Sequence, residues 1–144
     1  MPFAKFNFNE TAETVTFDYL SKDAIVFESE TIEENYGVED PRVVYRTLDE
    51  TYYMLYSAVQ SFPDRVASML SLATTKTPWV KESWDRKGFV LPTINWSKSG
   101  ALILRDDVPN SPHYLIWGDD HLRMAVSDDL KNFTNFPGKF IEPR

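Results

Sequence analysis

The sequence contains no cysteine and only five glycines among its 144 residues. Without cysteine the chain forms no disulfide, offers no thiolate nucleophile and binds no metal through sulfur. This absence is typical of a cytoplasmic protein, and we expect that location. The sequence also has no run of about 20 apolar residues and no apolar segment near its first residues, so it predicts neither a membrane span nor a signal peptide.

Positive charge is also scarce, with 15 Lys and Arg against 22 Asp and Glu and a net charge of −7. Nucleic acids and anionic membranes bind basic surfaces, so this balance argues against both as partners. Apolar residues make up 42% of the chain and aromatic residues 15%. This composition predicts a single globular domain over residues 1–144, and the wealth of aromatic residues favours β structure.

One local pattern occurs three times along the chain. A short apolar strand runs into Ser21, Thr75 or Ser127, and a polar turn and an aromatic residue follow. The three hydroxyl residues are spaced by 54 and 52 residues, a little above the period of propeller blades. The repeated stretches are DYLSKDAIVF (18–27), LATTKTPWVKESW (72–84) and MAVSDDLKNF (124–133).

Two hairpins lie between these repeats, over residues 42–59 and 101–120. Each has flanks rich in Val, Ile, Tyr, Leu and Trp, joined by a turn that carries Asp, Asn or Pro, at residues 48–50 and 106–112. The strands are nearly continuous apolar runs, which predicts burial on both faces. Nine prolines are spread along the chain and would interrupt most helices.

A hairpin, a strand, a turn and an aromatic-ended strand make four short antiparallel strands, which is the plan of a propeller blade. We therefore predict an all-β fold of the β-propeller type with about two and a half blades. Residues 18–28 supply half a blade, and residues 42–84 and 101–133 supply one blade each. A closed propeller needs about four or more blades, so the predicted set leaves open flanks. A single β-sandwich is the alternative.

The stretch GVEDPR (37–42) places two carboxylates and a guanidinium at the head of a strand. Gly37 permits a sharp entry turn, and Pro41 favours an extended backbone at Asp40. In an extended chain Arg42 projects to the same face as Asp40, where it would contact that carboxylate or a bound ligand. The alternative is a solvated turn in which Glu39 and Asp40 pair with Arg42.

The motifs YGVEDPRVVY, TYYMLYSA, LATTK, RKGFVLP, KSGALIL and HYLIWGDDHLRMAVSDDLKNF together resemble glycoside hydrolase family 130. The resemblance runs from about residue 18 to residue 144. This family comprises β-mannoside phosphorylases and related β-mannosidases, and its members are five-bladed propellers. The resemblance therefore implies a glycosidase or glycosyltransferase type of enzyme that acts on β-mannosides with inversion.

The resemblance assigns Asp40 as the general acid, which reaches the glycosidic oxygen through a sugar hydroxyl. In phosphorylases the nucleophile is inorganic phosphate, a candidate co-substrate here, and in hydrolases it is water. We expect no other cofactor and no metal. Candidate residues for binding substrate or phosphate accompany Asp40, and the aromatic face of the tryptophan among them suits the C–H groups of a pyranose ring. They are Glu39, Arg42, Arg86, Trp96 and Lys98.

Two departures from the family pattern bear on activity. The stretch IWGDDHLR (116–123) stands where the commonest phosphorylase form carries a His-Arg pair, which weakens the case for phosphorolysis. The early pocket arginine and the later parts of the family pattern have no counterpart in the chain. Asp119, Asp120 and His121 are adjacent, and neighbours on a strand point to opposite faces, so they predict no metal site by themselves.

Three interpretations remain open. The chain is a truncated member of the family that is weakly active or inactive, a carbohydrate-binding or structural half-propeller without turnover, or a chain that self-assembles through its open blade edges. A β-mannoside or related oligosaccharide is the expected ligand.

Overall fold

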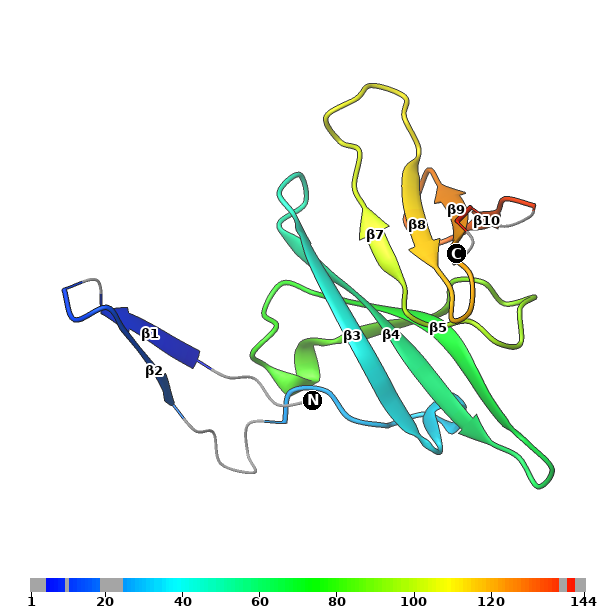
Figure 1. Cartoon of the computed structure of the whole chain (residues 1–144), viewed down its shortest axis with the longest axis horizontal. Helices are drawn as coiled ribbons and strands as arrows, with labels where there is room; N and C mark the ends of the chain where they lie inside the picture. Colours follow the sequence, from blue (N-terminus) through cyan, green and yellow to red (C-terminus); the bar gives the residue numbers. More distant parts are fainter. Residues whose placement is uncertain (1–4, 10, 19–24, 138–139, 142–144) are drawn as a thin grey trace.

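The computed structural model describes residues 5–9, 11–18, 25–137 and 140–141. Its regular structure consists of β-strands and two short 3-10 helices, and the predicted all-β class is confirmed. Eight strands form two four-stranded antiparallel sheets in the orders β3-β4-β5-β6 and β7-β8-β9-β10 (Figure 1). Their bounds are β3 Gly37–Arg46, β4 Thr51–Ser61, β5 Val66–Thr75, β6 Asp85–Phe89, β7 Ala101–Ile103, β8 His113–Trp117, β9 Arg123–Ser127 and β10 Thr134–Asn135.

The first sheet, β3–β6, is centred on two long strands that are buried on both faces. Nearly all side chains from the middle of β4 through β5 are buried, as their continuous apolar sequence predicts. β3 forms the edge of this sheet and is largely exposed, so the prediction of burial on both faces is wrong for it. An edge strand has a neighbour on one side only, which leaves its side chains open to solvent.

The two sheets pack against each other through one continuous core. Leu55, Leu70 and Leu72 of the first sheet meet Leu115 and other buried side chains of the second sheet. The opposite face of the first sheet has its own core, where Phe27 packs edge-on against Tyr56 and Trp84. The η2 helix (Ile32–Glu34) also lies against β4. Segments from within the chain therefore cover both faces of this sheet.

The described residues cover the second sheet, β7–β10, on one face only. Along β8 the side chains alternate between buried and half-buried, beginning with His113 and ending with Trp117. Burial on both faces was predicted for this hairpin, and that prediction is wrong. Alternation is the pattern of a sheet with one face in a core, because successive side chains point to opposite faces.

The repeated turns occupy corresponding places in the two sheets. Thr75 ends β5, and its hydroxyl accepts a hydrogen bond from the Thr77 amide at 3.0 Å. Ser127 ends β9, and its hydroxyl bonds Asp129 at 2.9 Å. In each case the chain then enters the last strand of the sheet, as the repeat predicts. The third position, Ser21, lies outside the described residues.

A two-stranded antiparallel hairpin precedes both sheets and was not predicted. It consists of β1 (Lys5–Asn9) and β2 (Thr14–Asp18), and Figure 1 shows it to one side of the two larger sheets. Most of the predicted half blade at 18–28 falls outside the described residues. In the part of the chain that is described, no helix has the length and apolar character that crossing a membrane requires.

Candidate functional site

The GVEDPR segment forms a β-bulge in the edge strand β3. Glu39 is paired with Ser57 and Arg42 with Leu55, so Asp40 and Pro41 together oppose a single residue of β4. Gly37 enters the strand with a φ of +143°, a conformation open to glycine and strained for other residues. Pro41 lacks an N–H, and the interrupted ladder at the bulge requires none from it.

The bulge corrects two predictions about this segment. Asp40 has a φ of +51° and is left-handed, not extended. Aspartate is one of the few residues that visits this region readily, and the bulge needs a residue in it. The extra residue also breaks the alternation of side chains along β3, so the rule that places Arg42 on the same face as Asp40 does not apply. Residues paired across strands share a face, and Arg42 therefore lies on the same face of the sheet as Glu39.

All three charged residues of the segment are exposed. The side chain of Arg42 donates to the Pro41 carbonyl oxygen at 3.5 Å, and among the described residues no ion pair joins it to Asp40 or Glu39. The alternative of a turn closed by an ion pair therefore does not describe the segment. Asp40 is exposed to solvent on a backbone that the bulge fixes, so a ligand can approach its carboxylate.

Arg86 lies on β6 and is engaged by acidic partners. Its Nε donates to Glu34 at 3.0 Å, one terminal nitrogen pairs with Glu30 at 2.8 Å, and the other donates to the Glu28 carbonyl oxygen at 2.5 Å. The guanidinium also lies 4.2 Å from the centre of the Phe27 ring. These contacts tie β6 to the chain segment that covers the first sheet.

Glu34 is the buried centre of this arrangement, with 1% of its surface exposed. Its carboxylate accepts from the Tyr56 hydroxyl at 2.7 Å, from Arg86 and from the Glu30 amide at 2.9 Å. Burial alone would raise the pKa of Glu34, but these hydrogen bonds and the charge of Arg86 bring it below its usual value. Burial and the neighbouring carboxylate together raise the pKa of Tyr56.

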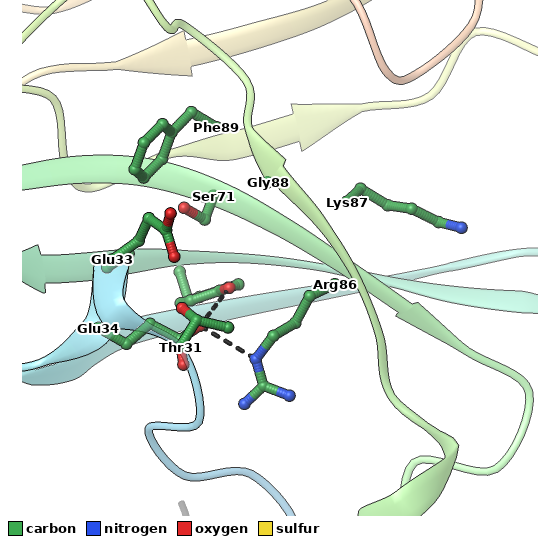
Figure 2. A pocket seen from close by; sticks show the side chains of 10 residues that line it. Thr31, Glu33, Glu34, Ser71, Arg86, Lys87, Gly88 and Phe89 are labelled. Atoms are coloured by element: carbon green, nitrogen blue, oxygen red, sulfur yellow. Dashed lines mark hydrogen bonds and ion pairs between the residues drawn. The ribbon is translucent and has the colours of Figure 1, made fainter.

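A cleft of about 360 Å³ opens beside these groups. Figure 2 shows Arg86 reaching toward Glu34 while Lys87 points away from it. Ser71 and Phe89 line the same cleft from β5 and β6. The charges of Arg86 and Glu34 are already paired, so the cleft offers a neutralised pair and not a free cation at this position.

Sequence reasoning missed Glu34. The stretch TIEENYG gives no periodic signal, and its acidic residues look alike. The partners that distinguish Glu34 are distant, since Tyr56 lies 22 residues away and Arg86 lies 52 residues away. A pairing of this kind is set by the tertiary fold and leaves no trace in local sequence.

A second cluster joins Trp96, Lys98 and Asp119. The indole Nε1 of Trp96 donates to Asp119 at 3.0 Å, and the Lys98 ammonium lies 3.5 Å from the same carboxylate. Lys98 also lies 5.4 Å from the centre of the Trp96 ring. Trp96 is 47% exposed, so its ring is open to a ligand. Sequence reasoning named Trp96 and Lys98 but left out Asp119, which connects them.

Gly118 fixes the place of Asp119. It follows β8 with a φ of +152°, and its amide donates to the Lys98 carbonyl oxygen at 3.1 Å. A Cβ at this position would lie 1.8 Å from the carbonyl oxygen of His121. Only glycine fits this turn, and the turn holds the aspartate beside Trp96.

The candidate residues are divided between the two faces of the first sheet. The backbone of Trp96 pairs with that of Ser68 in β5, and Ser68 lies across β4 from Gly37 of β3. Arg86 of β6 is paired with Ala73 of β5. Residues paired across strands point to the same face of a sheet. Ala73 belongs to the core of Phe27, which lies on one face of the first sheet, whereas the core shared with the second sheet lies on the other face. Arg86 is therefore directed away from Trp96 and Lys98, which lie on the side of Glu39 and Arg42.

Trp96 and the acidic segment lie at the same end of the first sheet. Three steps between neighbouring strands separate Gly37 from Trp96, which corresponds to about 14 Å at about 4.8 Å a step. Among the described residues, no group of three or more His, Asp or Glu side chains is placed to hold a metal ion.

Sequence comparison relates the chain to enzymes of mannoside metabolism. The model of glycoside hydrolase family 130, described as β-1,4-mannooligosaccharide phosphorylase, matches residues 4–144. A curated relative, the 1,2-β-oligomannan phosphorylase of Thermoanaerobacter sp. (strain X514), is 34% identical over 118 residues. The match covers 81% of this chain and 36% of that relative, so the chain spans little more than a third of the relative's length.

Comparison of structures gives the same picture for the fold. A glycosyl hydrolase from Bacteroides ovatus superposes with a TM-score of 0.66 at 22% identity, over 83% of this chain and 38% of that one. The β-1,2-mannobiose phosphorylase of Listeria innocua, solved with β-1,2-mannobiose, gives a TM-score of 0.62 at 21% identity, over 87% and 33% of the two chains. At these identities the likeness shows the fold alone.

Proposed function

Because this chain belongs to glycoside hydrolase family 130, we propose that it is the part of a β-mannoside-active enzyme that carries the general acid, Asp40. The observation that supports this most is the bulge of β3, which holds Asp40 exposed and fixed in a left-handed conformation. We also propose that the two sheets are blades of a five-bladed propeller.

In this proposal Asp40 supplies the proton that the leaving glycosidic oxygen needs, relayed through a sugar hydroxyl. The bond from the anomeric carbon to that oxygen breaks while phosphate or water attacks from the opposite face, which inverts the configuration. Trp96 stacks on a sugar ring, and Lys98 and Arg42 donate to hydroxyl or phosphate oxygens. Glu39, on the same face as Arg42, accepts from a sugar hydroxyl.

Arg86 is the candidate residue that fits phosphate binding least well. Its guanidinium is paired with Glu30 and Glu34, so a phosphate would have to displace a carboxylate to reach it. This pairing favours water over phosphate as the nucleophile. With about a third of the length of its relatives, the chain alone is expected to turn over slowly or not at all, because the groups of an active site act as a unit.

Product analysis tests the proposal. The chain is incubated with β-1,2- or β-1,4-mannobiose, with and without inorganic phosphate. Release of mannose without phosphate indicates hydrolysis, and mannose 1-phosphate indicates phosphorolysis. Asp40→Asn is expected to reduce the rate by about a hundredfold or more, whereas Asp64→Asn, a matched change at an exposed turn, leaves it unchanged. Equal and measurable rates for Asp40→Asn and the unsubstituted chain would remove Asp40 from its role, whereas no turnover in either favours carbohydrate binding without turnover.

Carbohydrate binding without turnover is the second candidate function. The cluster of Trp96, Lys98 and Asp119 favours it, because an exposed indole is flanked by a cation and a carboxylate. Trp96→Ala is expected to abolish the binding of mannobiose in calorimetry. Trp79→Ala removes a tryptophan that is 56% exposed elsewhere on the surface and is expected to leave binding intact. Loss of binding in both variants would argue against a site at Trp96.

A further inference from the structure

Trp96 is anchored to both sheets. Its backbone pairs with that of Ser68 in β5, and the next residue, Ser97, donates its amide to the Ser68 carbonyl oxygen at 2.8 Å and accepts from the Leu70 amide at 3.0 Å. The indole N–H is held from the other side, because it donates at 3.0 Å to Asp119, which follows β8 of the second sheet. The fold therefore orients the ring before a ligand binds, which lowers the entropic cost of binding.

Asp119 uses its two carboxylate oxygens for different partners. Oδ2 accepts from the indole of Trp96, and Oδ1 lies 3.5 Å from the ammonium nitrogen of Lys98. The backbone joins the same two segments, since the Gly118 amide donates to the Lys98 carbonyl oxygen at 3.1 Å. Among the described residues, Lys98 forms an ion pair with Asp119 alone. One carboxylate thus orients the ring and balances the positive charge beside it.

This pairing leaves the group of Trp96, Lys98 and Asp119 without net charge. An anion bound at Lys98 would also lie close to the carboxylate of Asp119, whose repulsion would offset the attraction of the ammonium. A sugar hydroxyl meets no such conflict, because it accepts from an ammonium and donates to a carboxylate at the same time. The side chains of Lys98 and Asp119 are 29% and 47% exposed, so both can still contact a ligand after they have paired.

The edge strand at this end of the first sheet has no excess of positive charge either. It carries Glu39, Asp40 and Arg42, all exposed, so two carboxylates accompany one guanidinium. Anion sites concentrate uncompensated cations. The surroundings of Trp96 therefore suit a neutral ligand and do not override the charge balance that Asp119 sets.

We propose that Asp119 determines the selectivity of this site, directing it to the hydroxyl groups of a neutral sugar and away from phosphate and other anions. The sugar ring stacks on Trp96 while one of its hydroxyls bridges Lys98 and Asp119. This inference rests on the proposed function for its ligand, a mannoside, and on the contacts of Asp119 for its mechanism. Without the charge of Asp119, Lys98 is an unpaired cation and attracts anions.

Asp119→Asn tests the proposal, because it removes the charge and keeps the shape and a carbonyl oxygen that accepts from the indole. Calorimetry measures the binding of inorganic phosphate and, separately, of β-1,2-mannobiose to the whole chain. The affinity for phosphate is expected to rise about fivefold or more, since one unit of opposing charge is lost close to Lys98. The affinity for mannobiose is expected to fall about threefold, because a hydroxyl loses a charged acceptor.

Two further variants identify the source of the change. Asp120→Asn removes the same charge from the adjacent residue, whose carboxylate contacts His121 and not Lys98, and is expected to leave both affinities unchanged. Asp119→Asn combined with Lys98→Met is expected to lose the gain in phosphate affinity. Circular dichroism establishes that each variant is folded, and Asp119→Ser is a second neutral substitution to use if Asp119→Asn is not.

The outcomes separate this inference from the proposed function. The role of Asp119 is overturned by no gain in phosphate affinity in Asp119→Asn, by an equal gain in Asp120→Asn, or by a gain that persists without Lys98. A rise in the affinity for mannobiose together with that for phosphate overturns the selectivity. A chain that binds no mannobiose counts against the proposed function, whereas the phosphate measurement needs no sugar and still decides whether Asp119 keeps anions from Lys98.

Discussion

The two four-stranded sheets share one plan and differ in what covers them. Each is built from a hairpin, a strand and a polar turn that leads into a final strand. The first sheet is covered on one face by the second sheet and on the other by residues such as Phe27 and by the η2 helix. Within the described part of the chain, the second sheet is covered on one face alone. The same local pattern therefore yields central strands buried on both faces in the first sheet and on one face in the second.

This difference also separates two kinds of polar chemistry. On the covered face of the first sheet, Glu34 is removed from water and satisfied by Tyr56 and Arg86. At the junction of the sheets, Asp119 and Lys98 meet beside an exposed Trp96. The buried group is committed to holding the fold, and the exposed group is free to meet a ligand. Substitutions at neighbouring positions distinguish the two environments.

The largest expected effect comes from two adjacent residues on opposite faces of β8. Leu115 is fully buried, whereas Ile116 points to the opposite face of the sheet and is half-buried. Leu115→Ala is expected to lower the free energy of unfolding by about 4 kcal/mol, and Ile116→Ala by about 1 kcal/mol, because only the first leaves a cavity in a packed core. Urea unfolding followed by tryptophan fluorescence measures both losses. Equal losses would mean that both faces of the second sheet are covered.

The sequence was sufficient to predict most strands of the two four-stranded sheets, because their apolar composition acts locally, but it did not predict the β1–β2 hairpin. The turns at residues 47–50 and 104–112 and the final strands after Thr75 and Ser127 follow from runs of Val, Tyr, Leu and Ile between polar residues. The same runs could not show which faces are covered. Both hairpins look continuously apolar, yet only β4 and β5 are buried on both sides. Coverage depends on distant segments such as that of Phe27 and not on the strand itself.

The candidate site was predictable in its residues and not in its arrangement. The motif GVEDPR identifies Asp40, but the rule that proline favours an extended residue before it gave the wrong backbone there. The bulge imposes a left-handed conformation through pairing with β4. Trp96 and Lys98 were named individually, whereas the carboxylate of Asp119 that links them follows a different strand. Whether these residues act on a mannoside stays a prediction.

The second prediction compares the neighbouring acids Glu34 and Glu33. Glu34→Gln removes the charge that faces Arg86 inside the fold and is expected to lower the free energy of unfolding by about 3 kcal/mol at pH 7. Glu33→Gln changes a half-buried neighbour with no ion pair among the described residues and is expected to cost less than about 0.5 kcal/mol. Similar losses for the two variants would mean that the pairing of Glu34 with Arg86 contributes little.

The pH dependence of the Glu34 effect has a definite sign. Because the folded structure lowers the pKa of Glu34 below its ordinary value of 4.5, the charged form stabilises the fold. This stabilisation is fully present above about pH 4.5 and is lost as the pH falls through the folded pKa. The difference in free energy of unfolding between the unsubstituted chain and Glu34→Gln is therefore expected to be constant from neutral pH to about 5. It is expected to become smaller below pH 4.5. A difference that grows in acid would mean that the fold raises the pKa of Glu34 instead of lowering it.

The smallest expected effect lies in the corresponding turns of the two sheets. In the first sheet the turn is held by the Thr75 hydroxyl, which bonds the Thr77 amide and Ser83. In the second sheet the carboxylate of Asp129 holds the turn, because it accepts hydrogen bonds from the backbone amides of Asn132 at 2.7 Å and Lys131 at 2.9 Å. These amides hold the pKa of Asp129 well below its usual range.

Asp129→Ala is expected to lower the free energy of unfolding by about 1 kcal/mol, the value of a net hydrogen bond or two at a solvated turn. The adjacent, exposed Asp128→Ala is the matched control and is expected to have no measurable effect. Thr75→Val tests the equivalent turn of the first sheet, where the loss is expected to be independent of pH because the hydroxyl does not ionise in the accessible range. The Asp129 contribution, by contrast, is expected to disappear in strong acid, when the carboxylate is protonated. A loss of stability in Thr75→Val that depends on pH would contradict the assignment of the first turn to a hydroxyl. No loss of stability in Asp129→Ala would contradict the assignment of the second turn to a carboxylate.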